Sequence, residues 1–326
     1  MSQSASSAPP TKRGQVAVAA LREEDLPAAE RICRIAFGTF FGAPEPEKVF
    51  SDLDCVRSRY RAPHIAAFGA TLDGDFVGSN FATNWGSVGT FGPLTVRPDR
   101  QEYGIGQALL ARTMAQFDAW APSHVGLFTF AHSAKHVGLY QKFGFHPRFL
   151  TAIMAAPAGQ AKAAGGWSRL SELAAAEHAQ TLAACREITE TIYPGLDLSG
   201  EIISARTQRL GDTLLLESRG GLGGFAICHY GPTSEAGAGN CFVKFGAVRC
   251  GASAEPDYLR LLDACDGMAV AVGMPNVLAG TNMAREEAYR HLVARGFRAR
   301  IQGVTMHRPN EAGYSRPGVY VLDDWR

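Results

Sequence analysis

Leu94-Thr-Val-Arg-Pro-Asp-Arg-Gln-Glu-Tyr-Gly-Ile-Gly-Gln107 is the stretch that decides the fold of this chain. An apolar strand ends near Val96, a polar turn follows, and Gly104-Ile105-Gly106 opens a helix whose apolar residues recur at helical spacing. The first N–H groups of a helix have no partner within it, and the helix dipole favours negative charge there. Glycine lets a ligand approach the backbone because it has no Cβ. The stretch therefore predicts a phosphate-binding turn.

In these residues the chain resembles the GCN5-related N-acetyltransferase (GNAT) family. The pyrophosphate loop of that family has Arg or Gln, two residues, Gly, one residue, and then Gly or Ala. Gln101, Gly104 and Gly106 fill these places, and residues 139–145 are similar to the family segment Leu-Tyr-x-x-x-Gly-Phe. The resemblance covers residues 16–155 and implies an N-acetyltransferase that takes acetyl-CoA as co-substrate.

The resemblance also implies which residues would contact acetyl-CoA. Gly92-Pro93 interrupts the strand, which predicts a bulge or a splayed edge. In the family, the pantetheine inserts at this splay like a missing strand. Ser133 stands where the family often has asparagine, although it could serve only as a helix N-cap. The expected contacts are Leu94, Thr95, Val96, Gln101, Glu102, Tyr103, Gly104, Ile105, Gly106, Gln107 and Ser133.

Amine acetylation needs a proton for the departing thiolate and a route for the proton of the amine. By resemblance, Tyr140 is the expected donor to the thiolate. Many family members carry a glutamate base on the central strand, but residues 87–95 contain no acid. His132 is the first candidate base because its pKa suits neutral pH, and His136 is the second. An acceptor that arrives neutral would need no base, so the route stays open.

The second half of the chain repeats the first at a shift of 152 residues, which pairs Val96-Arg97 with Val248-Arg249. In this register, Pro256 and Tyr258 replace the two loop glycines, and Leu292 replaces the tyrosine donor. Proline lacks the N–H that would hold a phosphate, and a tyrosine side chain would fill the ligand's space. The second half is therefore predicted to be a degenerate copy that has lost cofactor binding.

The predicted fold class is α/β, with two tandem GNAT-like domains, each a mixed, mostly antiparallel sheet flanked by helices. The first domain is expected to run β-α-α-β-β-β-α-β-α-β, with its first helix over 22–37 and its second over 47–60. Phe37, Phe40 and Phe41 are expected to pack against the core rather than line a pocket. The predicted parts are a disordered tail over 1–14, a catalytic domain over 15–155, a linker over 156–166 and a degenerate domain over 167–326.

Composition limits the other functional classes. The chain has 326 residues, a formal net charge of +1 and no apolar run long enough for a membrane helix, so neither nucleic acid nor a membrane is an expected partner. Seven scattered cysteines without a Cys-x-x-Cys pair favour free thiols in the cytoplasm over a metal site or disulfides. The expected partner is a small-molecule or protein amine. The alternatives are a non-catalytic acyl-CoA sensor and a platform for a homodimer or another partner.

Overall fold

The computed structural model describes residues 14–161, 165–231 and 234–326. All of the predicted tail except Gly14, and residues 162–164 of the predicted linker, lie outside the described residues. The first half contains the strands β1 (Val16–Ala20), β2 (Ile65–Leu72), β3 (Asp75–Trp85), β4 (Val88–Phe91), β5 (Thr95–Val96), β6 (His124–Thr129) and β7 (His146–Pro157). Its helices are α1 (Leu26–Phe40), α2 (Arg57–Tyr60), α3 (Ile105–Trp120) and α4 (Ala134–Gln141).

The second half begins where the predicted linker ends. Its strands are β8 (Trp167–Arg169), β9 (Gly211–Ser218), β10 (Gly221–Gly231), β11 (Gly237–Val248), β12 (Asn276–Asn282), β13 (Arg298–Arg308) and β14 (Val321–Leu322). Its helices are α5 (His178–Ile192), α6 (Ser199–Thr207), α7 (Ala254–Ala271) and α8 (Glu286–Ala294). Because β7 extends to Pro157, the first two residues assigned to the linker belong to a strand.

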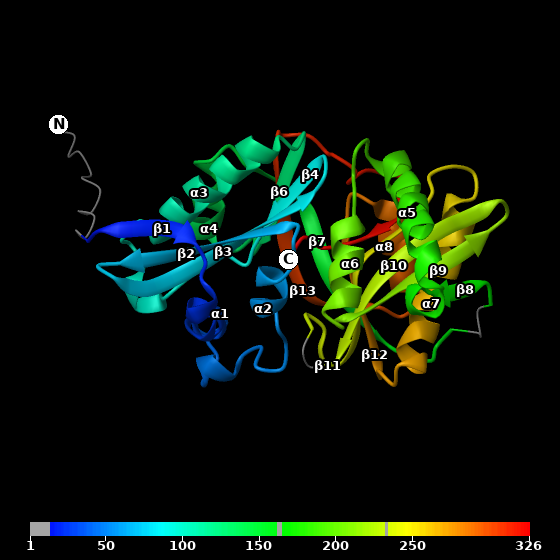
Figure 1. Ribbon diagram of the computed structural model, residues 1–326, viewed down its shortest axis with the longest axis horizontal. Helices are drawn as coiled ribbons and strands as arrows, with labels where there is room; N and C mark the ends of the chain where they lie inside the picture. Colours follow the sequence, from blue (N-terminus) through cyan, green and yellow to red (C-terminus); the bar gives the residue numbers. More distant parts are fainter. Residues whose placement is uncertain (1–13, 162–164, 232–233) are drawn as a thin grey trace, which may run out of the picture.

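In the described part of the chain, all strands join one mixed sheet that runs through both halves (Figure 1). Its order is β1-β2-β3-β4-β6-β13-β7-β12-β11-β10-β9-β8, with β5 beside β3 and β14 beside β11. The last long strand of each half pairs with a strand of the other half, and we call these two strands exchanged. β13 of the second half pairs with β6 of the first, and β7 of the first half pairs with β12 of the second. A division of the chain near residue 155 therefore does not divide the sheet.

The two halves share a strand register at the shift seen in the sequence. In the first half, β4 pairs in parallel with β6, with Val88 opposite His124. In the second half, β11 pairs in parallel with β12, with Asn240 opposite Asn276. Both members of the second pair lie 152 residues after their counterparts. The positions of β6, α4 and β7 match β12, α8 and the start of β13 at the same shift.

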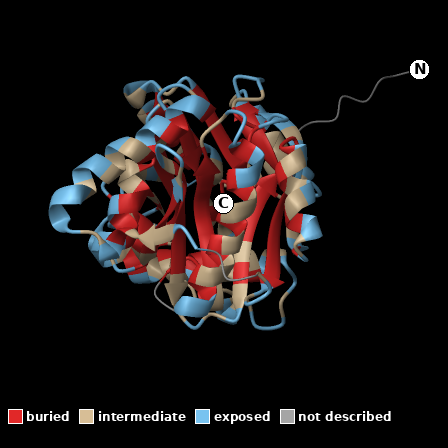
Figure 2. Ribbon diagram, turned by 90° about the vertical axis from the view of Figure 1, so that its right-hand side faces the viewer, coloured by how far each residue is buried: buried red, intermediate tan, exposed pale blue. Residues whose placement is uncertain are grey.

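Apolar residues on the helices bury against both faces of the sheet. On one face, α3 contributes Leu109, Leu110 and Phe117 to a core cluster with β2, β3 and β6. On the other face, Leu26 and Cys33 of α1 pack against β3 in a separate cluster. Figure 2 shows the buried strands at the centre and the exposed faces of the helices outside. Among the described residues, no helix combines the length and apolar character needed to cross a membrane.

Two expectations about local structure have different outcomes. The helix predicted over 47–60 is wrong: this segment contains one 3-10 turn and the short helix α2. Phe50 there takes a positive φ of 58°, which an α-helix does not accommodate, and the Asp54 carboxylate accepts the N–H of Arg57 at 2.9 Å to start α2. The interruption predicted at Gly92-Pro93 is confirmed, because it separates β4 from β5.

Candidate active site

The glycine-rich turn begins α3 as the sequence predicted. Gly104 is the N-cap of α3 and has φ 79°, a left-handed conformation that disfavours residues with a Cβ. Its carbonyl accepts the N–H of Ala108 at 2.9 Å, which closes the first turn of the helix. A Cβ placed on Gly104 would meet nothing within 4 Å, so the space beside the turn is open. This turn presents helix N–H groups toward a cavity.

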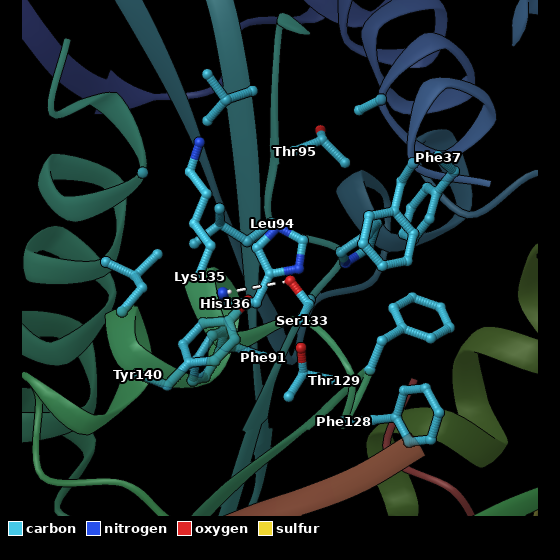
Figure 3. Close-up of a pocket in the computed structure, with 18 of the residues that line it drawn as sticks. Phe37, Phe91, Leu94, Thr95, Phe128, Thr129, Ser133, Lys135, His136 and Tyr140 are labelled. Atoms are coloured by element: carbon cyan, nitrogen blue, oxygen red, sulfur yellow. Dashed lines mark hydrogen bonds between the residues drawn. The ribbon is translucent and has the colours of Figure 1, made fainter. Parts of the chain in front are cut away.

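A cavity of about 980 Å³ lies beside this turn. Tyr140 and nearly all of the predicted acetyl-CoA contacts line this cavity. The predicted contact Tyr103 and the candidate base His132 do not line it. The predicted residues that line it are Leu94, Thr95, Val96, Gln101, Glu102, Gly104, Ile105, Gly106, Gln107, Ser133 and Tyr140. The tertiary structure thus brings the loop, the broken strand and α4 around one space (Figure 3).

The broken strand leaves one backbone edge open along this cavity. β4 pairs with β6 only from Val88 to Thr90. After the break at Gly92-Pro93, β5 pairs with β3 through Thr95 and Val96. Among the described residues, no strand pairs with the other edge of β5, and that edge borders the cavity. A ligand with amide groups could therefore add to the sheet at this edge.

Tyr140 is placed to donate a hydrogen bond into the cavity. Its side chain is buried, and its ring meets Phe91 edge-on with the ring centroids 5.7 Å apart (Figure 3). Burial raises the pKa of Tyr140, so the hydroxyl keeps its proton at neutral pH. Because ionisation of the buried hydroxyl is costly, the arrangement favours hydrogen-bond donation over complete loss of the proton.

Of the two candidate bases, the structure places only His136 in the cavity wall. His132 is exposed, and its ring stacks on Phe40 with the centroids 5.4 Å apart. Burial, together with Lys135 and His132, lowers the pKa of His136. A neutral imidazole in the wall can accept a proton, so position favours His136 over the first candidate. Ser133 is the N-cap of α4, because its hydroxyl accepts the N–H of His136 at 3.4 Å, and it also lines the cavity.

Sequence reasoning missed a cation at the glycine turn. The Lys135 ammonium donates to the Gln101 side-chain oxygen at 2.8 Å, so it lies over the loop that lacks the arginine common in the family. Arg100 also lines the cavity, whereas Arg97 is held by Asp99 at 2.8 Å outside it. A signal was available: Lys135 stands in the first turn of α4, where the helix dipole disfavours a cation.

Phe37 and Phe40 of α1 and the next residue, Phe41, line the cavity. The expected packing against the core is seen for Phe37, which also contacts the core cluster of α1. Phe41 is 43% exposed, and Phe37 and Phe40 are only partly buried. Phe40 and Phe41 each approach Phe130 of the strand end after β6, with centroids 4.8 and 5.4 Å apart. The sequence showed the cluster but not the facing aromatic residue, which is remote in the chain.

The second half completes the wall of the cavity at the strand break. Arg59 of α2 donates to both carboxylate oxygens of Glu235, at 2.9 and 2.8 Å, to the Arg326 carbonyl at 2.7 Å and to the Gly92 carbonyl. Lys244 donates to the same Glu235 carboxylate at 2.8 Å. This buried network ties the broken strand of the first half to the second half and to the last residues of the chain.

Comparison with known proteins relates part of this chain to the acetyltransferases. Residues 29–145 match the model of the acetyltransferase (GNAT) family. A candidate acetyltransferase from Pyrococcus horikoshii is similar in structure, with a TM-score of 0.66, 14% identity and 95% of each chain covered. A GCN5-related N-acetyltransferase from Sphaerobacter thermophilus has a TM-score of 0.58 and 17% identity, with 90% of this chain and 95% of that chain covered. No curated protein sequence matches the chain.

These similarities cover both halves of the chain, and at this identity they show the fold alone. A third similar structure is a GCN5-related glucosamine N-acetyltransferase region of a fungal β-N-acetylglucosaminidase. It has a TM-score of 0.63 and 13% identity, with 91% of this chain and 38% of that chain covered. Residues 29–145 therefore match the GNAT family model, and the whole chain shares the overall fold of these solved structures.

Proposed function

We propose that this protein is an N-acetyltransferase that moves the acetyl group of acetyl-CoA directly to a primary amine within a ternary complex. The observation that carries the proposal is the open edge of β5, which borders a cavity between the Gly104 turn and Tyr140. This arrangement offers N–H groups for a pyrophosphate, a strand edge for pantetheine amides and a hydroxyl for a departing sulfur. Each residue type fits the part of acetyl-CoA that would reach it.

The chain's own groups divide the chemistry among them. The N–H groups of the Gly104 turn and the Lys135 ammonium bind the phosphates. The backbone of Leu94 to Val96 holds the pantetheine and polarises the thioester carbonyl. The amine nitrogen forms a bond to the carbonyl carbon, the carbon–sulfur bond breaks, and the sulfur leaves with the electron pair. Tyr140 donates a hydrogen bond to that sulfur.

The amine must lose one proton to become an amide. His136 is the residue for this step, because it lies in the cavity wall and its lowered pKa keeps the ring neutral at pH 7. The proton passes from the attacking nitrogen to the His136 ring and then to solvent. Direct transfer is proposed over an acyl-enzyme because no cysteine falls within the glycine turn or the residue 139–145 motif, and the sulfur of Cys55, which lines the cavity, contacts the sulfur of Cys33 at 3.9 Å.

We further propose one working site per chain, with the second half a degenerate copy. Two contacts of the second half support this. β14 pairs with β11 through Gly246 and Ala247, which are the counterparts of Leu94 and Thr95, so a strand of the chain itself takes the place of pantetheine. Tyr258 is fully buried and donates to the Ala288 carbonyl at 3.3 Å, where the first half has the open turn.

Isothermal titration with acetyl-CoA tests this proposal, together with a steady-state assay of free thiol release in the presence of amines. One binding site per chain and amine-dependent thiol release are expected. Two sites would contradict the assignment of the second half as degenerate. Binding without turnover on any amine would indicate an acyl-CoA sensor instead, and absence of binding would refute the site altogether.

A further inference from the structure

The part of the cavity at the strand break differs in chemistry from the part at the glycine turn. We name it the acceptor chamber and define it by Phe37, Phe41, Phe50, Phe128, Ile301 and Trp325, all of which line the cavity. It adjoins the strand break because Arg59, which also lines the cavity, donates to the Gly92 carbonyl. The Leu94–Val96 edge lines the same cavity as this chamber.

The walls of the acceptor chamber are apolar and come from both halves of the chain. Phe37 of α1 and Phe41, the residue after α1, each pack against Phe50, with ring centroids 5.5 and 6.0 Å apart. Ile301 is supplied by the exchanged strand β13. Trp325 lies over β6 at Gly126, where a Cβ would collide with its ring. Aromatic faces of this kind bind apolar groups of a ligand.

Charge in the acceptor chamber is already balanced by the protein. Of the described residues that line the cavity, the acids are Glu102, which is exposed on the glycine turn, and Glu235. Glu235 is shared by the Arg59 guanidinium and the Lys244 ammonium. Burial alone would raise the pKa of Glu235, but these two cations hold it well below its usual value. Glu102 lies at the glycine turn, and Glu235, the acid beside the acceptor chamber, is already paired.

We infer that the acceptor is a primary amine carried on a bulky aromatic or aliphatic group without a second positive charge. This inference rests on the proposed acetyl-transfer function and names the substrate class of the same site. The apolar group fills the chamber, and the amine nitrogen points to the strand break beside Leu94. Polyamines and aminoglycosides do not fit, because their further ammonium groups would meet apolar walls, the Arg59 guanidinium and a Glu235 carboxylate that is already paired.

The apolar walls also account for the acid missing from the central strand. An ammonium group that enters an apolar chamber loses hydration, which favours its neutral form. The acceptor class inferred here therefore reaches the site as the nucleophilic free amine more readily than a solvated polyamine would. His136 then has only the proton of the attacking nitrogen to accept.

The test compares 2-phenylethylamine, ethylamine and spermidine as acceptors in the thiol-release assay with the full chain and acetyl-CoA. We expect kcat/KM for 2-phenylethylamine to exceed that for ethylamine and for spermidine by at least about tenfold, since one methylene in an apolar pocket already discriminates by about 10-fold or more. Preference for spermidine would overturn the inferred class and leave the acetyl-transfer proposal intact.

A variant that introduces a negative charge makes the test specific to the chamber. Phe41 is 43% exposed, so Phe41→Asp places a carboxylate in the chamber wall without emptying the core. This variant should lose at least tenfold in kcat/KM for 2-phenylethylamine and gain on spermidine. Phe149→Asp is the matched control, because Phe149 is 55% exposed and lies outside the cavity wall. Equal effects of both variants would overturn the inference.

Two further measurements distinguish the acceptor chamber from the proposed acetyl-CoA site. If the chamber held a long acyl chain instead of the acceptor, octanoyl-CoA would exceed acetyl-CoA as donor to ethylamine, and that result would overturn the inference. If acetyl-CoA did not bind, the proposed function would fail. The chamber would still be supported if 2-phenylethylamine alone quenched the tryptophan fluorescence of the wild type and did not quench that of Phe41→Asp. Absence of such quenching would overturn it.

Discussion

Replacing Arg59 with methionine tests the buried network that joins the two halves at the site. The side chains of Arg59 and Glu235 are only 6% and 8% exposed. Removing one partner of a buried ion pair costs about 3–5 kcal/mol, because the other charge is left without compensation. Here Lys244 still contacts Glu235 at 2.8 Å, so we expect the lower end of that range, about 3 kcal/mol.

The assay is the free energy of unfolding from urea titration, measured for the wild type, Arg59→Met, Glu235→Gln and the double variant. The double variant removes both charges, so its loss should be smaller than the sum of the single losses by about 1–3 kcal/mol. A loss below about 1 kcal/mol in Arg59→Met, or strictly additive losses, would refute the reasoning that this pair is buried and coupled.

Three further predictions concern the turn, the donor and pH. Gly104→Pro should abolish acetyl-CoA binding in titration calorimetry, because proline cannot adopt the φ of 79° at this position. Gly104→Ala should keep the fold and lower the free energy of unfolding by about 1–2 kcal/mol. Normal acetyl-CoA binding by the proline variant would contradict the site. Tyr140→Phe should lower kcat about 100-fold with little change in the Kd for acetyl-CoA, and an unchanged kcat would remove Tyr140 from the mechanism. Burial lowers the pKa of His124 and His229 to about 4 and, aided by His124, that of His307 to about 3. Below pH 6.5 the unfolded chain therefore binds more protons than the folded chain. The free energy of unfolding should be highest above pH 6.5 and fall by up to about 1.4 kcal/mol per histidine per pH unit as the pH drops toward 4. A free energy of unfolding that does not change with pH in urea titrations would contradict the burial of these histidines.

Local sequence determined the elements of the proposed phosphate-binding turn. Gly104 stands where the chain needs a positive φ to begin α3, and Gly92-Pro93 stands where the strand breaks. Both effects depend on the backbone of one or two residues, so a linear pattern reveals them. The segment between α1 and α2 was not predictable in this way, because Phe50 takes a positive φ there and its ring packs against Phe37, a residue outside the segment.

The repeat of 152 residues was also readable in the sequence, since paired strands such as β4–β6 and β11–β12 keep the same spacing. The pairing partner of the last long strand of each half could not be read from the sequence. β7 and β13 each contain a continuous run of buried residues, and such a run can be buried beside a strand of either half. Only the assembled sheet decided that β13 would pair with β6.

The acceptor side of the site belongs entirely to tertiary structure. Arg59, Glu235, Ile301 and Trp325 lie far apart in the chain and carry no shared motif, yet they line one cavity. Their roles depend on burial and on which charges meet, and neither quantity is a property of a short sequence window. The sequence alone located the glycine turn and the strand break on which the proposed acetyl-CoA site depends, because backbone turns are local. The fold decided what the amine would meet, because a chamber is made of side chains brought together from remote segments.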